Sequence, residues 1–184
     1  NFCEQATPEG VVLTRLRHPD NVKWTGRSLS DVMAETGKDW LDAVMDLIVS
    51  ERQRVEAIFV LMSEENIRLF LEQPWMSFCT DAGGRDPERS ANTVAHPRAY
   101  GTFTKILGQY VREEKLLTLE EAIRKMTSLP AERLAIRDRG LLKPGNFADI
   151  VVFDPETVAD RATYEQPHQL SVGMKHVFVN GVEV

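Results

Sequence analysis

Asp81 is the residue whose type and surroundings most clearly suggest chemistry. It directly follows an apolar stretch, residues 75–80, and precedes Ala82-Gly83-Gly84. The carboxyl end of a parallel strand is where α/β proteins place catalytic groups, and a carboxylate there can accept and donate protons. The glycines would let a substrate or a metal ion approach the backbone. The local pattern is equally compatible with an acid that caps the next segment, so both interpretations stay open.

Arg98 marks a second candidate position, within the run His-Pro-Arg-Ala-Tyr-Gly at residues 96–101. This run ends a long polar stretch that begins at Gly84, and long loops in compact domains are often functional. An arginine there could bind a carboxylate through two parallel hydrogen bonds. The alternative, a surface arginine beside a turn, is favoured by the local sequence alone. His96 could be a metal ligand, although a single loop histidine is more often simply exposed.

The elements that would position these residues are predicted from hydrophobic periodicity and from capping residues. The pattern indicates a buried strand over residues 55–61, a helix from Ser63 to Pro74, and a second strand over residues 75–80. Such a βαβ unit implies parallel strands joined by a right-handed crossover. Cys79 would then point to the same side of the second strand as Asp81, although packing is the usual role of a cysteine in an apolar strand.

The remaining elements flank this unit. The patterns predict a strand near Val11, helices over residues 28–37, 40–48, 103–111 and 118–126, a short helix from Ser128, a strand over 148–153 and a hairpin over 177–182. A capping box at Thr118 and the Asn180-Gly181 dipeptide are the strongest of these local signals. The segment from residue 140 onward therefore forms a small β element distinct from the α/β body.

The composition limits the function classes. The chain has 184 residues, with 22 lysines and arginines against 28 aspartates and glutamates, which gives a formal charge of −6. This acidic balance argues against broad affinity for nucleic acid or anionic membranes. No apolar run approaches the ~18 residues of a membrane span, and no secretory signal is visible. We therefore expect a cytoplasmic protein with neither nucleic acid nor membrane as a partner.

Metal-ligating residues are scarce. The two cysteines, Cys3 and Cys79, are too few for a zinc ribbon or a disulfide scaffold. We expect free thiols, with a single disulfide as the alternative. The four histidines are scattered without an HxH or HExxH pattern, so neighbouring histidines cannot assemble a three-ligand zinc site. The chain opens with Asn1 instead of methionine, which suggests a processed or truncated start.

Four segments carry a family resemblance. They are Cys79-Thr80-Asp81-Ala82-Gly83, then His96-Pro97-Arg98-Ala99-Tyr100-Gly101-Thr102-Phe103, then the Thr-Leu-Glu-Glu-Ala-Ile-Arg-Lys-Met-Thr run of residues 118–127, and then the Gly-Leu-Leu-Lys-Pro-Gly-Asn-Phe-Ala-Asp-Ile-Val-Val-Phe-Asp run of residues 140–154. In this order they resemble the C-terminal part of amidohydrolase-superfamily enzymes. The narrower second segment is most similar to N-acyl-D-amino-acid deacylases, also called D-aminoacylases.

The resemblance implies a fold and a set of roles. The family fold is α/β, a TIM-like (β/α)8 metal-dependent hydrolase barrel with a small β domain. Residues 1–139 would be the last strands and helices of the barrel, and residues 140–184 the C-terminal part of the β domain. Asp81 matches the catalytic aspartate, a general base on zinc-bound water that then protonates the leaving amine, and it could also touch the metal. Arg98 matches the arginine that binds the substrate α-carboxylate, and Tyr100 is assigned to the same substrate-binding site.

The chain lacks the family's other zinc ligands, namely its HxH pair, its metal-binding cysteine and the histidines of its fifth and sixth strands. The implied function is thus that of a fragment of a zinc-dependent deacylase for small N-acyl amino acids, and we expect the 184 residues alone to be inactive. Two alternatives stay open: a non-catalytic assembly or interaction module, and another amidohydrolase such as a dihydroorotase-like enzyme. Exposed strand edges also favour a homo-oligomer of the isolated chain, or pairing with a missing N-terminal segment.

Overall fold

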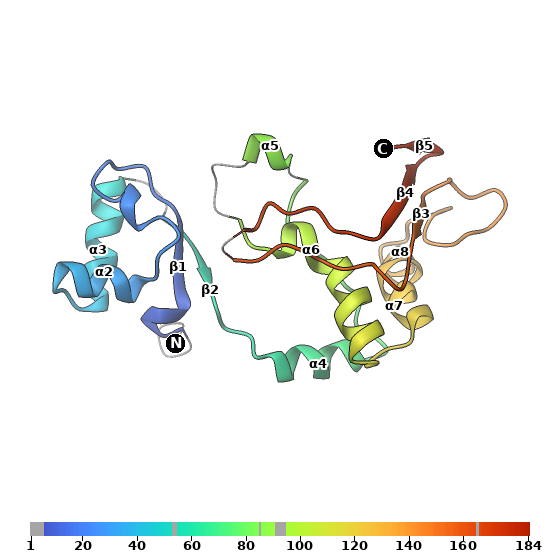
Figure 1. Cartoon of the computed structure of the whole chain (residues 1–184), viewed down its shortest axis with the longest axis horizontal. Helices are drawn as coiled ribbons and strands as arrows, with labels where there is room; N and C mark the ends of the chain where they lie inside the picture. Colours follow the sequence, from blue (N-terminus) through green and yellow to red (C-terminus); the bar gives the residue numbers. More distant parts are fainter. Residues whose placement is uncertain (1–5, 53–54, 85, 91–94, 165) are drawn as a thin grey trace. The chain divides into compact units, whose positions relative to one another are not determined.

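The chain divides into two units (Figure 1). Unit 1 comprises residues 1–63 and 91–96, and unit 2 comprises residues 64–90 and 97–184. The computed structural model describes residues 6–52, 55–84, 86–90, 95–164 and 166–184. Cys3 lies outside the described residues.

Unit 1 combines two short strands with two helices. Its elements are η1 (Pro8–Gly10), β1 (Val11–Arg15), η2 (Val22–Trp24), α2 (Leu29–Thr36), α3 (Trp40–Glu51) and β2 (Glu56–Phe59). The predicted first strand and both predicted helices are confirmed. Ser28 caps α2 in a reciprocal box with Asp31, and Gly37 ends α2 in the left-handed conformation, with φ of 69°. These local signals were readable because capping depends on residues only a few positions apart.

The core of unit 1 lies where α2 and α3 meet β1. Its buried members are Leu13, Leu16, Trp24, Leu29, Val32, Ala43 and Leu47. The buried carboxylate of Glu51, at the end of α3, accepts the backbone N–H groups of Arg17 (2.9 Å) and His18 (3.1 Å). It also accepts the side-chain amide of Asn21 at 2.9 Å. This one carboxylate therefore accepts hydrogen bonds from a turn, residues 17–21, that belongs to neither a strand nor a helix.

The predicted parallel βαβ unit over residues 55–84 is wrong. β2 instead pairs antiparallel with β1, with Val11 opposite Phe59. Residues 75–80 form no strand, and the N–H of Phe78 donates to the carbonyl of Lys125 at 3.2 Å. A parallel ladder needs a neighbouring strand, and no strand in the described part of the chain runs beside residues 75–80. The predicted burial of the first strand is also wrong, since Phe59 is 46% exposed.

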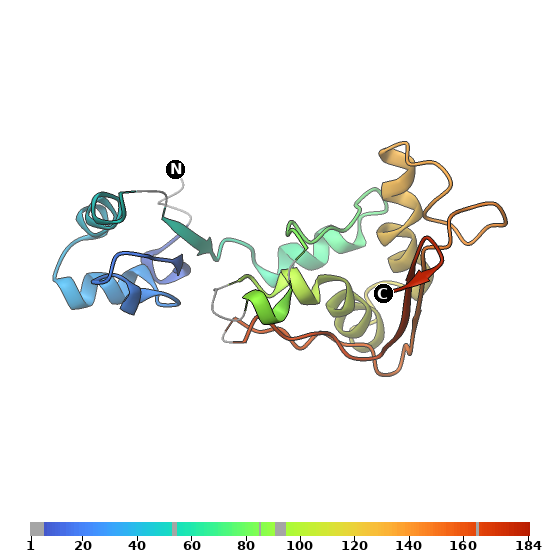
Figure 2. The ribbon, with the colours of Figure 1, turned by 90° about the horizontal axis from the view of Figure 1, so that it is seen from above.

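Unit 2 packs helices beside a three-stranded sheet (Figure 2). Its elements are α4 (Glu64–Glu72), α5 (Pro87–Ser90), α6 (Arg98–Lys105), η3 (Ile106–Glu113), α7 (Leu119–Met126), α8 (Ser128–Arg133), β3 (Ile150–Phe153), β4 (Met174–Val179) and β5 (Val182–Glu183). The sheet is antiparallel, with strand order β3-β4-β5. Its buried core comprises Leu71, Ile106, Leu107, Tyr110, Ala122 and Val158.

The helical and hairpin predictions in unit 2 are confirmed, with one extension. The helix predicted over residues 103–111 begins earlier, as α6, and continues as the π-helix η3. Thr118 caps α7 by accepting the N–H of Glu121. Asn180 and Gly181 both have positive φ, 52° and 81°, as a tight two-residue hairpin turn requires. The domain boundary at residues 139 and 140 stays a prediction. None of the helices in the described residues has the length and apolar character needed to cross a membrane.

Lys125 is the one lysine among the largest fully buried side chains of the described chain. Its ammonium donates to the carbonyl of Leu71 at the end of α4, and it lies 5.7 Å from the ring centre of Phe78. Glu121 provides a carboxylate oxygen 3.9 Å away. Burial lowers the pKa of Lys125, and the Glu121 carboxylate opposes that shift. Lys125 therefore joins α4, α7 and the segment that leads to Asp81.

A substitution at Lys125 tests how much its ammonium contributes to the free energy of unfolding. We expect Lys125→Met to lower the free energy of unfolding by about 1–3 kcal/mol, because the buried carbonyl of Leu71 loses its donor. Equilibrium chemical denaturation measures the change. The exposed Lys143 provides the matched control, since Lys143→Met should leave stability within about 0.5 kcal/mol of the parent. Equal stability of the two variants would contradict the role of Lys125.

A surface ion pair between η3 and α4 gives a pH-dependent prediction. Arg68 binds Glu114 through Nε (2.7 Å) and Nη2 (3.0 Å), and this contact, with a further hydrogen bond from Gln109, lowers the pKa of Glu114 from 4.5 to about 2. A carboxyl with a lowered folded-state pKa stabilises the fold above its ordinary pKa, and this contribution is lost as the pH falls from 4.5 towards 2.

We therefore expect Arg68→Ala to raise the pKa of Glu114 and to shift acid unfolding to higher pH. An NMR titration of the Glu114 carboxyl and a circular-dichroism acid titration measure the two effects. The exposed Arg133 serves as control, and an unmoved Glu114 titration in Arg68→Ala would refute the assignment.

Candidate active site

Asp81 directly follows the segment 75–80, which is a turn residue and then irregular backbone instead of the predicted strand. Its backbone has φ of 47°, in the left-handed region, and its side chain is 80% exposed. Aspartate tolerates this conformation better than most residues. The next turn is held by Thr80, whose hydroxyl accepts the N–H of Ala82 at 3.3 Å. The backbone thus turns the carboxylate outward, towards solvent.

Arg98 lies beside Asp81 in space, 17 positions further along the chain. Its Nη2 donates to Oδ2 of Asp81 at 2.8 Å and lies 3.4 Å from the carbonyl oxygen of the same residue. The prediction that Arg98 lies in a loop is wrong, because it is the first residue of α6, directly after Pro97. Proline fixes a backbone φ that suits a helix start, and the polar loop signal obscured it.

The two charged groups are suited to different roles in the hydrolysis of an amide. The guanidinium presents a planar fork that matches a carboxylate, and the adjacent carboxylate can move a proton. With side chains 44% and 80% exposed, their mutual ion pair contributes little to stability. The pair is therefore better suited to binding and proton transfer than to holding the fold together.

Tyr100 lies on the first turn of α6, two positions after Arg98. Its hydroxyl forms a hydrogen bond of 3.1 Å with Nδ1 of His168, and the two rings meet edge to face with centres 5.6 Å apart. The carbonyl oxygen of Tyr100 accepts the hydroxyl of Ser171 at 3.1 Å. His168 and Ser171 were not identified from the sequence, since nothing in one sequence links positions about seventy residues apart.

Cys79 and His96 are the other sequence candidates. Cys79 is exposed and has a free thiol. His96 belongs to unit 1, whereas Asp81 and Arg98 belong to unit 2. In the described residues no group of three or more histidine, cysteine, aspartate or glutamate side chains could hold a metal ion. The described part of this chain therefore does not by itself form a zinc site, and Asp81 is at most one contributor to one.

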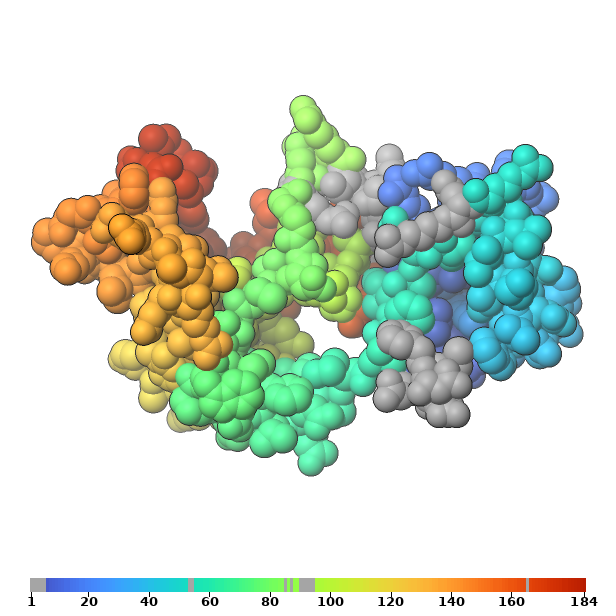
Figure 3. All heavy atoms as spheres, turned by 180° about the vertical axis from the view of Figure 1, so that it is seen from behind, coloured from blue at the N-terminus to red at the C-terminus, as the bar shows by residue number. Residues whose placement is uncertain are grey.

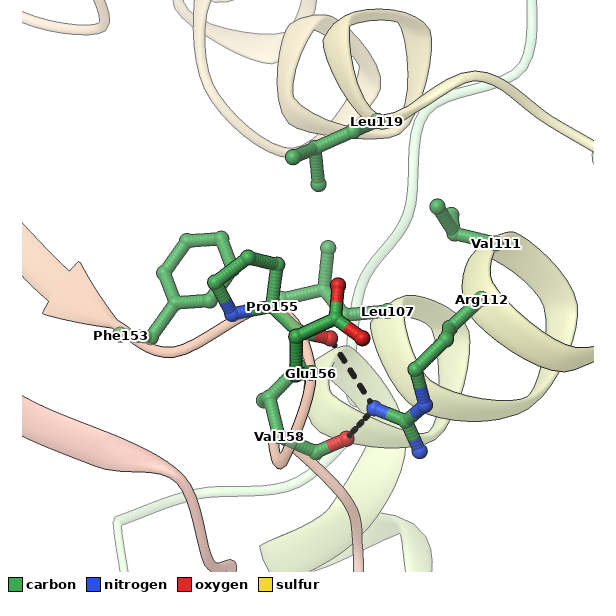
Figure 4. A pocket seen from close by; sticks show the side chains of 8 residues that line it. All are labelled: Leu107, Val111, Arg112, Leu119, Phe153, Pro155, Glu156 and Val158. Carbon is green, nitrogen blue, oxygen red and sulfur yellow. Dashed lines mark hydrogen bonds between the residues drawn. The ribbon is translucent and has the colours of Figure 1, made fainter.

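A separate cavity of about 180 Å³ lies between η3, α7 and the segment after β3 (Figure 4). Its walls are mainly apolar, formed by Leu107, Val111, Leu119, Phe153, Pro155 and Val158, with Arg112 and Glu156 beside them. Arg112 donates through Nη1 to the carbonyls of Pro155 (3.2 Å) and Val158 (2.6 Å). This guanidinium secures the backbone, so the cavity is a packing gap and not a second polar site.

The fold agrees with comparisons to known proteins. The pattern of the amidohydrolase family matches residues 27–184, and the chain belongs to this family. Within the family, it is 42% identical over 159 residues to an N-acyl-D-glutamate deacylase from Alcaligenes xylosoxydans xylosoxydans, which covers 86% of this chain and 30% of that protein. The chain thus spans less than a third of the length of this relative.

Solved structures give the same result. The chain superposes on N-acyl-D-glutamate deacylase from Bordetella bronchiseptica, solved with zinc and a phosphonate inhibitor, with a TM-score of 0.83 and 38% identity, over 98% of this chain and 35% of that one. A D-aminoacylase structure matches with a TM-score of 0.82 and 35% identity, over 96% and 35% of the two chains. These similarities confirm the predicted resemblance to the deacylases and the predicted fold class, part of a TIM-like amidohydrolase barrel.

A dihydroorotase from Lactobacillus acidophilus is also similar. It is 34% identical over 76 residues, which is 41% of this chain and 17% of that protein. The deacylase similarity extends over about twice as much of the chain.

Proposed function

We propose that this chain is the C-terminal part of a zinc-dependent N-acyl-D-amino-acid deacylase. The enzyme hydrolyses a carbon–nitrogen amide bond and releases a carboxylate and a D-amino acid. The observation that carries the proposal is the 2.8 Å contact between Arg98 and Asp81, which joins a carboxylate-binding group to a proton-transfer group. The similarity to the deacylases over 86% of the chain supports it.

The proposed roles follow from the chemistry of the two side chains. Asp81 accepts a proton from the water that attacks the amide carbon, and donates it to the nitrogen as the carbon–nitrogen bond breaks. Arg98 binds the α-carboxylate of the substrate, which orients the amide relative to Asp81. Tyr100 belongs to the same substrate-binding region, two positions after Arg98 on α6.

Zinc enters the proposal through the relatives, since the Bordetella enzyme was solved with zinc and one D-aminoacylase is described as having a binuclear metal centre. When bound, zinc would polarise the amide and acidify water. The described residues do not provide a complete set of ligands. The proposal therefore assigns the remaining ligands to positions outside the described residues, and Asp81 is a candidate ligand within them.

The surface of α3 supports the proposal that this chain packs against further polypeptide (Figure 3). One face of the helix exposes Leu41, Met45 and Val49, which are 51%, 52% and 69% exposed. The spacing of four residues places them in one row along the helix, and contiguous apolar rows are typical of covered surfaces. Self-association of the 184-residue chain stays a prediction that rests on exposed strand edges, and this apolar row is a second reason for it.

The proposal extends to location and partners. A cytoplasmic location is supported by the exposed, free thiol of Cys79, because free thiols persist in reducing compartments. The substrate is a small N-acyl amino acid, and the net charge of −6 disfavours nucleic acid and anionic membranes as partners. A dihydroorotase-like activity is less well supported, since that similarity covers 41% of the chain.

The role of Asp81 is tested by Asp81→Asn in the complete protein that contains this chain. Asparagine keeps the size of the side chain and tolerates the left-handed backbone, but it cannot shuttle the proton. We expect kcat for N-acetyl-D-glutamate to fall by about 10²- to 10⁴-fold. Asp86→Asn, at a neighbouring aspartate that caps α5, is the matched control and should keep full activity. Full activity of Asp81→Asn would exclude the proposed role.

The role of Arg98 is tested by Arg98→Ala. Loss of a charged hydrogen-bonding contact should raise KM for N-acetyl-D-glutamate by about tenfold to a hundredfold. The same substrate with its α-carboxylate converted to an amide should not show this increase, because it offers no partner for the guanidinium. Arg89→Ala removes an exposed arginine of α5 and is the control. An unchanged KM in Arg98→Ala would remove this residue from the binding site.

A further inference from the structure

From the contacts of α6 we infer that the loop over residues 160–171 sets the position of Arg98, and that His168 is a positioning residue for substrate binding that acts through Tyr100. The inference rests on the proposed function of Arg98. The loop is closed at its base by two backbone hydrogen bonds between Ala159 and Val172, of 3.2 and 2.9 Å. It follows β3 and precedes β4 in the chain, and Figures 1 and 2 show this part of the chain running beside α6.

The helix touches this region almost backbone to backbone. Gly101 is buried, and a Cβ atom there would lie 2.8 Å from Cβ of Asp160. Gly108, further along in η3, has the carbonyl oxygen of Val158 at 2.7 Å from the same hypothetical atom. Any larger side chain at these two positions would push the helix away from the loop. The glycines therefore permit a close contact that fixes the distance between the helix and the loop.

Three polar contacts then fix how the first turns of α6 lie on the loop. The hydroxyls of Thr104 and Ser171 are 2.6 Å apart, and Ser171 donates to the carbonyl oxygen of Tyr100 at 3.1 Å. The Tyr100 hydroxyl and Nδ1 of His168 are 3.1 Å apart. Thr104 is buried, and the other three side chains are partly buried. These contacts are shielded from water, so they hold their geometry better than exposed ones.

The exposed ion pair between Arg98 and Asp81 does not fix the position of α6 in this way. Solvent-exposed pairs of this kind contribute little and leave long side chains mobile. The Arg98 side chain starts from the backbone of α6, and that backbone contacts the loop at Ser171 and Asp160. A small misplacement of a group that orients a substrate weakens binding even when the group itself is intact. Loosening the loop should thus weaken carboxylate binding without removing any reacting group.

The test is a set of variants in the complete protein, assayed with N-acetyl-D-glutamate. His168→Phe keeps an aromatic ring against Tyr100 but removes both ring nitrogens, and we expect KM to rise by about threefold to tenfold with kcat nearly unchanged. His168→Asn, whose amide can replace Nδ1, should restore KM. His176→Phe is the matched control, because His176 is exposed on β4. In an Arg98→Ala background, His168→Phe should add nothing further.

Hydrogen–deuterium exchange of residues 98–105 provides a readout that does not depend on turnover. Exchange should increase in His168→Phe and stay at the parent level in His168→Asn and His176→Phe. Unchanged exchange, or an unchanged KM in an active enzyme, would overturn the inference, as would an additive effect in the Arg98→Ala background. A parent protein that does not hydrolyse N-acyl-D-amino acids would overturn the proposed function, and the exchange comparison would then decide on the loop contact alone.

Discussion

The close contact of α6 and η3 with residues 158–160 is the constraint on which unit 2 depends. Because Gly101 and Gly108 have no side chains, the helix can approach Asp160 and Val158 directly. The same approach lets Arg112 reach the carbonyl oxygens of Pro155 and Val158, and it buries Val158 in the core. The helix that begins at Arg98 is thereby joined to the sheet that follows it in the chain. Packing, not the local sequence around Arg98, places the guanidinium.

The sequence predicted those elements whose signals are local. The caps at Ser28 and Thr118 and the turn at Asn180-Gly181 each depend on residues a few positions apart, and all three are present. The strand at residues 75–80 is the main failure. The apolar character of this segment was recognised, but a strand forms only where a neighbouring strand provides hydrogen bonds. Hydrophobic periodicity does not show whether such a neighbour exists. In its place, the backbone of Phe78 pairs with that of Lys125.

The candidate site was predictable to a different degree for each of its parts. Asp81 and Arg98 were identified from their types and from a family resemblance, and the structure brings them to 2.8 Å. The helical start at Arg98 was missed because a proline-containing, polar run resembles a loop as well as a helix N-terminus. His168 could not be identified, since its contact with Tyr100 spans 68 positions and depends on the path of a loop. Long-range contacts of single polar residues leave no pattern in one sequence.

The side chains of Asp81 and Arg98 are exposed, and the residues that contact their segments are buried or partly buried and belong to different parts of unit 2. The segment before Asp81 is tied to α7 through the backbone of Lys125, and the buried ammonium of Lys125 holds the end of α4. Arg98 is supported by α6 on the 160–171 loop through Tyr100 and Ser171. A change at Lys125 should act first on the placement of the carboxylate, and a change at His168 on that of the guanidinium, because Lys125 contacts the segment before Asp81 and His168 contacts Tyr100 of α6. Under the proposed roles, contacts on different segments let carboxylate binding vary while Asp81 keeps its own backbone contacts.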